Sequence, residues 1–255
     1  KLNTLKIFDI EKNLVTEAPS MPASASQVAT ETFQSKIFVS GGWSGIGRNR
    51  LTFAFNLATQ EWTQKSDWKR PRALMASTVF KEKIWLIGGN GNDSNNMQKV
   101  LSSVDSYDPV YDFWKAEASL LIARRSCSIW TFDNNIFVAG GNDDKGQNLD
   151  SIECYDPNLK LWYNWGKLPV PVSDADAVVL GDMVHIFSGN GNQGVLSLNL
   201  RESTSNLSDI YIQDLNTTTL AQAEVADGSV TASKITSKTI GKDQISDSIL
   251  KYLKP

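Results

Sequence analysis

The sequence predicts an all-β chain of repeated four-stranded sheets, and three observations support this. Glycine pairs recur about every fifty residues, at Gly41-Gly42, Gly88-Gly89 and Gly140-Gly141, with a degenerate Ser188-Gly189. Each pair ends a short apolar run of the kind that forms a strand, such as Lys83-Ile84-Trp85-Leu86-Ile87. An aromatic residue is followed seven positions later by Trp in three copies: Phe55 and Trp62, Tyr107 and Trp114, Tyr155 and Trp162.

Each repeat is expected to contain four strands. In the third copy these strands lie near residues 127–132, 136–139, 150–155 and 161–165. The turn before the last strand is marked by Tyr107-Asp108-Pro109 and Tyr155-Asp156-Pro157, where Pro fixes φ and Asp can bond the turn backbone. The same phase occurs at Phe8-Asp9, so the chain begins in the second half of a repeat.

A single four-stranded sheet cannot bury both of its faces. Radial stacking of successive sheets buries them, and this is the physical basis of a β-propeller. A period near fifty with a diglycine and a later Trp is typical of kelch repeats. Residues 1–200 therefore resemble kelch repeats, and the Trp side chains are expected to lie between neighbouring sheets.

The number of repeats leaves two arrangements open. The pattern provides the back half of one blade, three full blades and the front half of another. In the arrangement that we favour, these blades are part of a larger, incomplete ring. In the other, N-terminal strands near residues 5–10 and 14–17 complete the last blade and close a ring of about four repeats. An open ring would leave unpaired sheet edges.

Composition excludes several classes of function. The formal charge is -3 and no window contains a basic stripe, so nucleic acid is not an expected partner. The apolar runs are too short for membrane insertion. One His and two Cys are too few for a usual metal site, and no cofactor is expected. Cys127 and Cys154 should lie about 9.6 Å apart, on strands separated by a third, and remain free thiols.

Candidate ligand-binding residues gather on one face of the predicted disk. The loops after the second strand of each repeat, at residues 43–50, 90–99, 142–148 and 190–194, are long and polar and emerge beside the interblade loops. Rigid scaffolds often place binding sites on such loops. The candidates are Trp43, Arg48, Arg50, Arg70, Arg72, Asn90, Asn92, Asp93, Arg124, Arg125, Asn142, Asp143, Asp144, Asn190 and Asn192.

The arginines among these candidates are not equivalent. Arg72 and Arg125 stand at matching phases, where the kelch resemblance implies an arginine that braces neighbouring loops. Arg70 and Arg124 have no such explanation and are the stronger ligand candidates. Trp43 is the one indole without a repeat-based position, and it can stack on a sugar or a peptide. His185 occupies an apolar strand position, which favours core packing over catalysis.

The last part of the chain has a different composition. Beyond a linker at residues 201–214, apolar residues recur every five positions over residues 215–255. The segment around Asp227-Gly228-Ser229 resembles stalk repeats of phage tail fibres and bacterial surface proteins, which often form trimers. A homotrimer through this tail is therefore a candidate assembly. A disordered Ser/Thr linker is the alternative interpretation.

Together these patterns predict a non-enzymatic recognition or scaffold module. It would bind protein or glycan through the loop-rich face of a kelch-like propeller, and the tail favours an extracellular or cell-surface location. The chain starts at Lys1 without a leader, so we expect either a removed signal or a start inside a longer product. The alternative function is a carbohydrate-active propeller enzyme resembling sialic acid mutarotases, with catalysis by a loop carboxylate such as Asp143 or Asp144.

Overall fold

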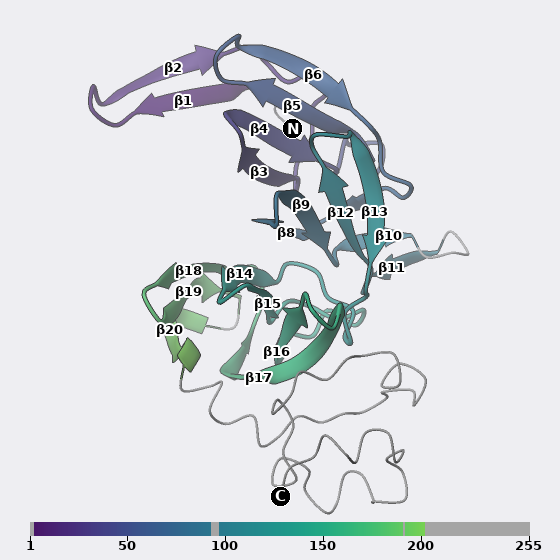
Figure 1. The fold of residues 1–255 in the computed structure, drawn as a ribbon, viewed down its shortest axis with the longest axis vertical. Coiled ribbons are helices and arrows are strands. Elements are labelled where there is room, and N and C mark those ends of the chain that lie inside the picture. Colours follow the sequence, from purple (N-terminus) through teal and green to yellow (C-terminus); the bar gives the residue numbers. More distant parts are fainter. Residues whose placement is uncertain (1–2, 93–96, 191, 202–255) are drawn as a thin grey trace, which may run out of the picture.

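The computed structural model describes residues 3–92, 97–190 and 192–201. Antiparallel sheets follow one another along the chain and form an open arc, with their inner strands toward a common axis (Figure 1). The all-β fold predicted from the repeats is therefore confirmed. The pentad tail at residues 215–255 lies outside the described residues, as does the linker beyond residue 201.

Three complete blades have the strand order expected from the sequence, each running from an inner first strand to an outer fourth strand. The first blade contains β3 (Ala29–Phe33), β4 (Lys36–Ser40), β5 (Thr52–Asn56) and β6 (Glu61–Lys65). The second contains β8 (Ala76–Phe80), β9 (Lys83–Ile87), β12 (Val104–Asp108) and β13 (Phe113–Glu117). The third contains β14 (Ser128–Phe132), β15 (Asn135–Ala139), β16 (Leu149–Asp156) and β17 (Leu161–Val172).

Incomplete sheets lie at the two ends of the arc. The N-terminal hairpin contains β1 (Leu5–Asp9) and β2 (Leu14–Ala18), and the terminal sheet contains β18 (Asp176–Leu180), β19 (Met183–Gly189) and β20 (Asn192–Asn199). A small ladder beside the second blade contains β7 (Arg72–Ala73), β10 (Asn90–Asn92) and β11 (Gln98–Val100). The inner strands β3, β8, β14 and β18 contact one another in sequence around the axis.

The recurrent Trp residues fasten each blade to the sheet before it. The indole Nε1 of Trp62 donates to the carbonyl of Pro19 at 2.7 Å, that of Trp114 to Ser66 at 2.8 Å, and that of Trp162 to Ala118 at 3.0 Å. Each acceptor directly follows the outermost strand of the preceding sheet. This confirms the interblade position predicted for the Trp side chains. It also shows that the N-terminal hairpin occupies the place of the outer two strands of a blade.

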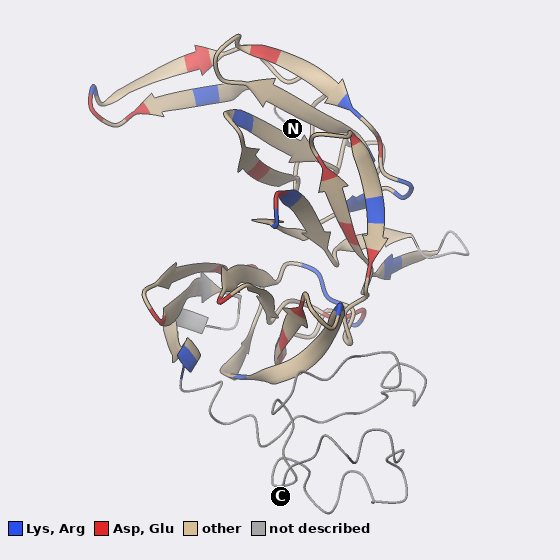
Figure 2. Ribbon diagram, in the orientation of Figure 1, with Lys and Arg blue, Asp and Glu red and all other residues tan. Residues whose placement is uncertain are grey.

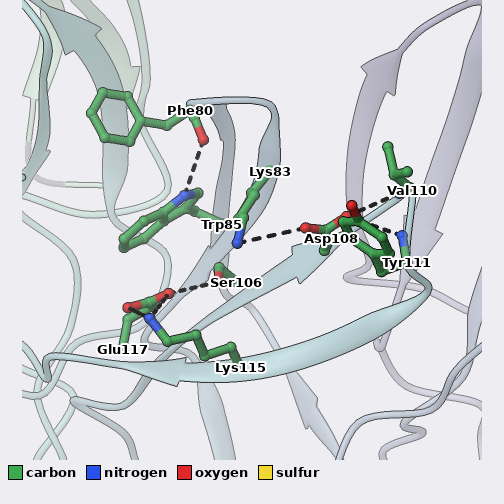
Figure 3. A network of polar contacts seen from close by, with 9 residues as sticks. All are labelled: Phe80, Lys83, Trp85, Ser106, Asp108, Val110, Tyr111, Lys115 and Glu117. Carbon is green, nitrogen blue, oxygen red and sulfur yellow. Dashed lines mark hydrogen bonds and ion pairs between the residues drawn. The ribbon is translucent and has the colours of Figure 1, made fainter.

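The Tyr-Asp-Pro turn works as the sequence predicts. Asp108 Oδ1 accepts hydrogen bonds from the backbone N–H groups of Val110 and Tyr111, at 3.0 and 3.1 Å, and so closes the turn between β12 and β13 (Figure 3). The other carboxylate oxygen of Asp108 lies 3.6 Å from Lys83 Nζ. Asp156 closes the matching turn of the third blade through Asn158 and Leu159. The Asp therefore fixes the hairpin that carries the Trp strand.

The ring of four closed by the N-terminal strands is not formed by the described residues. β1 pairs only with β2, and the free edge of β19 is taken by β20 instead. The sequence predicts only two strands in the last repeat, because residues 192–199 carry neither a Tyr-Asp pair nor a Trp. Their Leu196 and Leu198 side chains nevertheless pack against the core between the third blade and the terminal sheet, and this burial stabilises the third strand.

The two cysteines lie in the core as free thiols. Burial raises the pKa of Cys127 to about 11 and that of Cys154 to about 12. We expect neither thiol to react with Ellman's reagent at pH 8 in the native protein, whereas both react in guanidinium chloride, because the thiolate is the reactive form. Native reaction at the rate of an unfolded chain would contradict this.

The same thiols make stability depend on alkaline pH. Their folded pKa lies above the ordinary value of 9.0, so the unfolded chain loses its thiol protons first as the pH rises. The contribution of these groups is constant below pH 9 and falls as the pH rises from about 9 to about 12, the higher of the two folded pKa values. Urea melts of the wild type and of a Cys127→Ser Cys154→Ser variant should therefore differ in slope against pH in this window.

Candidate functional site

The loop-rich face predicted from the sequence is built on a repeated backbone pairing. The residue after each glycine pair bonds to the interblade segment, which gives the pairs Ser26 with Trp43, Ala73 with Asn90, Arg125 with Asn142 and Ser173 with Asn190. Steps of 47, 52 and 48 residues separate these positions, the same steps as between the glycine pairs. We call the loops at residues 43–50, 90–92, 97–99, 142–148 and 190, with these interblade residues, the loop face.

Neighbouring loops are bonded to one another across the blades. Arg48 Nη2 donates to Asn90 Oδ1 at 2.8 Å, the backbone N–H of Val100 donates to Asp144 Oδ1 at 2.6 Å, and Asn148 Nδ2 donates to the Asn190 carbonyl at 2.8 Å. These three bonds link the four loops in series. The loop face is therefore a braced surface, and Asn90, Asp144 and Asn190 contribute to its bracing.

Several other predicted ligand residues also have internal partners. Asp143 Oδ1 accepts from the backbone N–H groups of Lys145 and Gln147, and Asn142 Nδ2 donates to Asn148 Oδ1 at 2.7 Å. Arg50 Nε lies 3.5 Å from Asp67 Oδ2 in a largely exposed ion pair. Asn92 ends the short strand β10. Asp93 lies outside the described residues, and Asn192 begins β20 with a side chain that the structure does not describe.

The structure corrects the register of the arginines. Arg124, rather than Arg125, is the counterpart of Arg72, since both lie 16 residues before the first glycine of a pair and donate to its carbonyl. Arg124 is fully buried and Arg72 nearly so. Arg124 therefore lies in the interior and not on the loop face, against the expectation that it faces a ligand. The common spacing to the glycine pair is the signal that would have identified it.

The terminal nitrogens of both buried guanidinium groups have acceptors, whereas Nε of each is buried without a hydrogen-bond partner. Arg124 Nη1 donates to the carbonyls of Gly140 and Ser151, and its Nη2 donates to Ser151 Oγ at 2.9 Å and Glu153 Oε1 at 2.6 Å. Arg72 bonds in the same way to the carbonyls of Gly88 and Ser103, and it forms an ion pair with Asp105. Each arginine thus ties an interblade segment to the second and third strands of the next blade.

Three predicted residues of the loop face interact with one another. The Arg48 guanidinium lies 5.6 Å from the centroid of the Trp43 ring, and Trp43 remains partly exposed. Burial, and then the nearby charge of Arg125, lower the pKa of Arg48. Trp43, Arg48 and Arg125 therefore form one group. We call Arg48 and Arg125 the arginine pair.

The arginine pair lacks an internal counter-charge. Among the described residues, neither Arg48 nor Arg125 forms an ion pair with Asp or Glu. Arg125 Nε is buried without a hydrogen-bond partner, as is Nε of Arg72 and Arg124, but those two arginines each form an ion pair. The segment leading into β14, which carries Arg125, is blue in Figure 2 and lies between the second and third blades. Arg70 is exposed on a separate part of the interblade segment.

The remaining chemistry is sparse in the described part of the chain. No group of three or more His, Cys, Asp and Glu side chains there is arranged to hold a metal ion. His185 Nδ1 lies 2.9 Å from Ser197 Oγ, on the neighbouring strand. A search of the described residues finds no helix with the length and apolarity needed to span a membrane.

Comparison with known proteins agrees with this architecture. Residues 123–164 match the family model described as "Kelch motif". The chain is 29% identical to beta-scruin of Limulus polyphemus over 63% of its length, and 26% identical to kelch-like protein 35 of Mus musculus over 79%. It spans only 19% and 32% of those two relatives.

A solved structure has a similar fold. The structure of YjhT superimposes with a TM-score of 0.64 at 15% identity, covering 72% of this chain and 65% of that one. At this identity the likeness concerns the fold. The matched motif, the relatives and the blade geometry together support a kelch-repeat protein with a kelch-type propeller fold.

Proposed function

We propose that this chain is a non-enzymatic scaffold that binds a protein partner on its loop face, with the arginine pair and Trp43 at the centre of the contact. The observation that carries the proposal is the pair of neighbouring guanidinium groups without an acidic partner among the described residues. The kelch-repeat relatives also support a protein-binding scaffold.

The chemistry of this group fits an acidic segment of a polypeptide. Two guanidinium groups can each bind a carboxylate through paired N–H donors, and such charge-assisted bonds are the stronger ones. The partly exposed Trp43 indole offers an apolar surface beside them. The bonds between loops already hold the site in place. Binding would therefore lose little conformational entropy from the loops.

The proposal is tested with a fluorescein-labelled peptide of six Glu residues and a matched peptide of six Gln residues. Fluorescence anisotropy should detect binding of the Glu peptide, weakening as salt is added, and much weaker binding of the Gln peptide. Arg48→Gln and Arg125→Gln should each weaken the Glu peptide about tenfold, a loss of about 1.4 kcal/mol. Arg50→Gln is the control, because its charge is already paired with Asp67.

Four results would overturn this function. Equal binding of the two peptides, or unchanged binding in the Arg48→Gln Arg125→Gln double variant, would show that the guanidinium groups do not select a carboxylate. Binding on a glycan array, lost in Trp43→Ala and without peptide binding, would favour the glycan ligand instead. Turnover of a sugar that is abolished by Asp143→Asn or Asp144→Asn would favour the enzyme alternative.

The finer expectations from the sequence remain predictions. These are a glycan ligand, an extracellular or cell-surface location and a homotrimer through residues 215–255. The two carboxylates suggested for the enzyme alternative both accept backbone hydrogen bonds within or between loops. A carboxylate engaged in this way is a less available general base than a free one, so we favour the scaffold function.

A further inference from the structure

The two ends of the arc expose apolar side chains that face along the direction of blade stacking. At one end, Phe8 and Val15 lie opposite each other on the hairpin and are 56% and 55% exposed. At the other end, the outward side of the terminal sheet carries Val178, Leu180, Phe187 and Val195, of which Leu180 is 62% exposed. We call these surfaces the leading face and the trailing face. Figure 1 shows them at opposite ends of the arc.

Both surfaces occupy positions that are buried wherever a neighbouring blade is present. Phe8 corresponds to Phe55 and Tyr107, and the side chains of both of these are fully buried. On the trailing face, Val178 corresponds to Trp130 and Phe187 corresponds to Ala139, both of which are covered by the terminal sheet. These side chains are therefore exposed because no further sheet covers them among the described residues, and their apolar character matches that of the buried positions.

The contact between blades repeats with the same residues. Three residues before the glycine pair, an aromatic ring meets the Tyr of the next blade: Phe38 lies 5.9 Å from Tyr107, and Trp85 lies 4.9 Å from Tyr155. His185 holds this position on the trailing face and Phe8 holds the Tyr position on the leading face. The two faces thus carry the two halves of an interface that the chain already forms internally.

We propose that the trailing face of one copy of this chain packs on the leading face of a second copy, continuing the stacking of blades from one molecule to the next. The contact is heterologous, because two different surfaces meet. His185 of one copy would lie against Phe8 of the other, and Val178, Leu180 and Phe187 would be buried beside it. Removal of these apolar side chains from water drives the association.

The test uses analytical ultracentrifugation of the 255-residue chain from about 1 to 100 μM, a range matched to micromolar association. The wild type should self-associate with increasing concentration. Phe8→Asp on the leading face and Leu180→Asp on the trailing face should each weaken this association at least tenfold. Val110→Asp is the control, because Val110 is also exposed but lies in the turn between β12 and β13, away from both faces.

Mixing the two variants separates this arrangement from others. Phe8→Asp keeps an intact trailing face and Leu180→Asp keeps an intact leading face, so an equimolar mixture should form a dimer that neither forms alone. Val15→Asp and Val178→Asp repeat the test, and thermal melts followed by circular dichroism establish that each variant is folded. A wild type that stays monomeric throughout, or folded variants that associate like the wild type, would overturn the proposal.

Discussion

Replacement of Arg124 by Ala is expected to lower the free energy of unfolding by about 3–5 kcal/mol, because it leaves a buried carboxylate without its counter-charge. Glu153 is almost completely buried, and Arg124 is its ion-pair partner at 2.6 Å. The same carboxylate accepts the backbone N–H groups of Leu121 and Ile122, at 2.7 and 3.0 Å. Loss of Arg124 thus affects the carboxylate and the interblade segment together.

Equilibrium urea denaturation followed by Trp fluorescence measures this change. Arg70→Ala provides the control, because Arg70 is exposed, and it should shift stability by no more than about 0.5 kcal/mol. A double-mutant cycle with Glu153→Ala then isolates the coupling between the two side chains. An Arg124→Ala loss below about 1 kcal/mol would contradict the role that we assign to the buried arginine.

Replacement of Gly141 by Ala is expected to cost about 2–5 kcal/mol, the sum of a backbone term and a packing term. Gly141 has φ of +92°, a conformation that side chains of L residues disfavour. A Cβ at this position would lie 2.6 Å from the carbonyl oxygen of Arg125 and 3.0 Å from Cys127 Cβ. Backbone and core would both have to shift.

Gly146→Ala separates the two terms. Gly146 also has positive φ, +76°, but a Cβ there would meet no atom within 4 Å. Its replacement should therefore cost only the backbone term, about 1–2 kcal/mol. Thermal melts give the destabilisation of each variant. The difference between the two values measures the packing cost that arises because the interblade segment lies so close to Gly141. Equal destabilisation by both variants would show that the second glycine of the pair is required for its backbone conformation alone and not for the close contact with the interblade segment.

The blades could be predicted from the sequence because their main determinants recur at a fixed spacing. A glycine pair, a Tyr or Phe and a Trp each mark one strand or its end, so Gly140, Tyr155 and Trp162 together locate the strands of the third blade. β20 could not be predicted in this way. Its apolar residues Leu196 and Leu198 are stabilised by a neighbouring blade and carry no signature of their own.

The candidate site was less predictable, because its contacts join residues that are distant in sequence. Arg48 and Asn90 are 42 residues apart, and Val100 and Asp144 are 44 apart, so no local pattern indicates that these loops brace one another. The interior position of Arg124 was predicted wrongly, because Arg125 was aligned with Arg72, although Arg72 and Arg124 both lie 16 residues before a glycine pair. Trp43, Arg48 and Arg125 were all identified as candidates from the sequence, and only the structure shows that they lie together.

The indole hydrogen bonds have a consequence for biosynthesis. Trp62, Trp114 and Trp162 all donate to a carbonyl on the N-terminal side, directly after the outermost strand of the preceding sheet. Each acceptor has therefore already left the ribosome when its Trp emerges. The propeller blades can consequently dock one at a time during translation, because the acceptor for each Trp lies on a part of the chain that has already been synthesised.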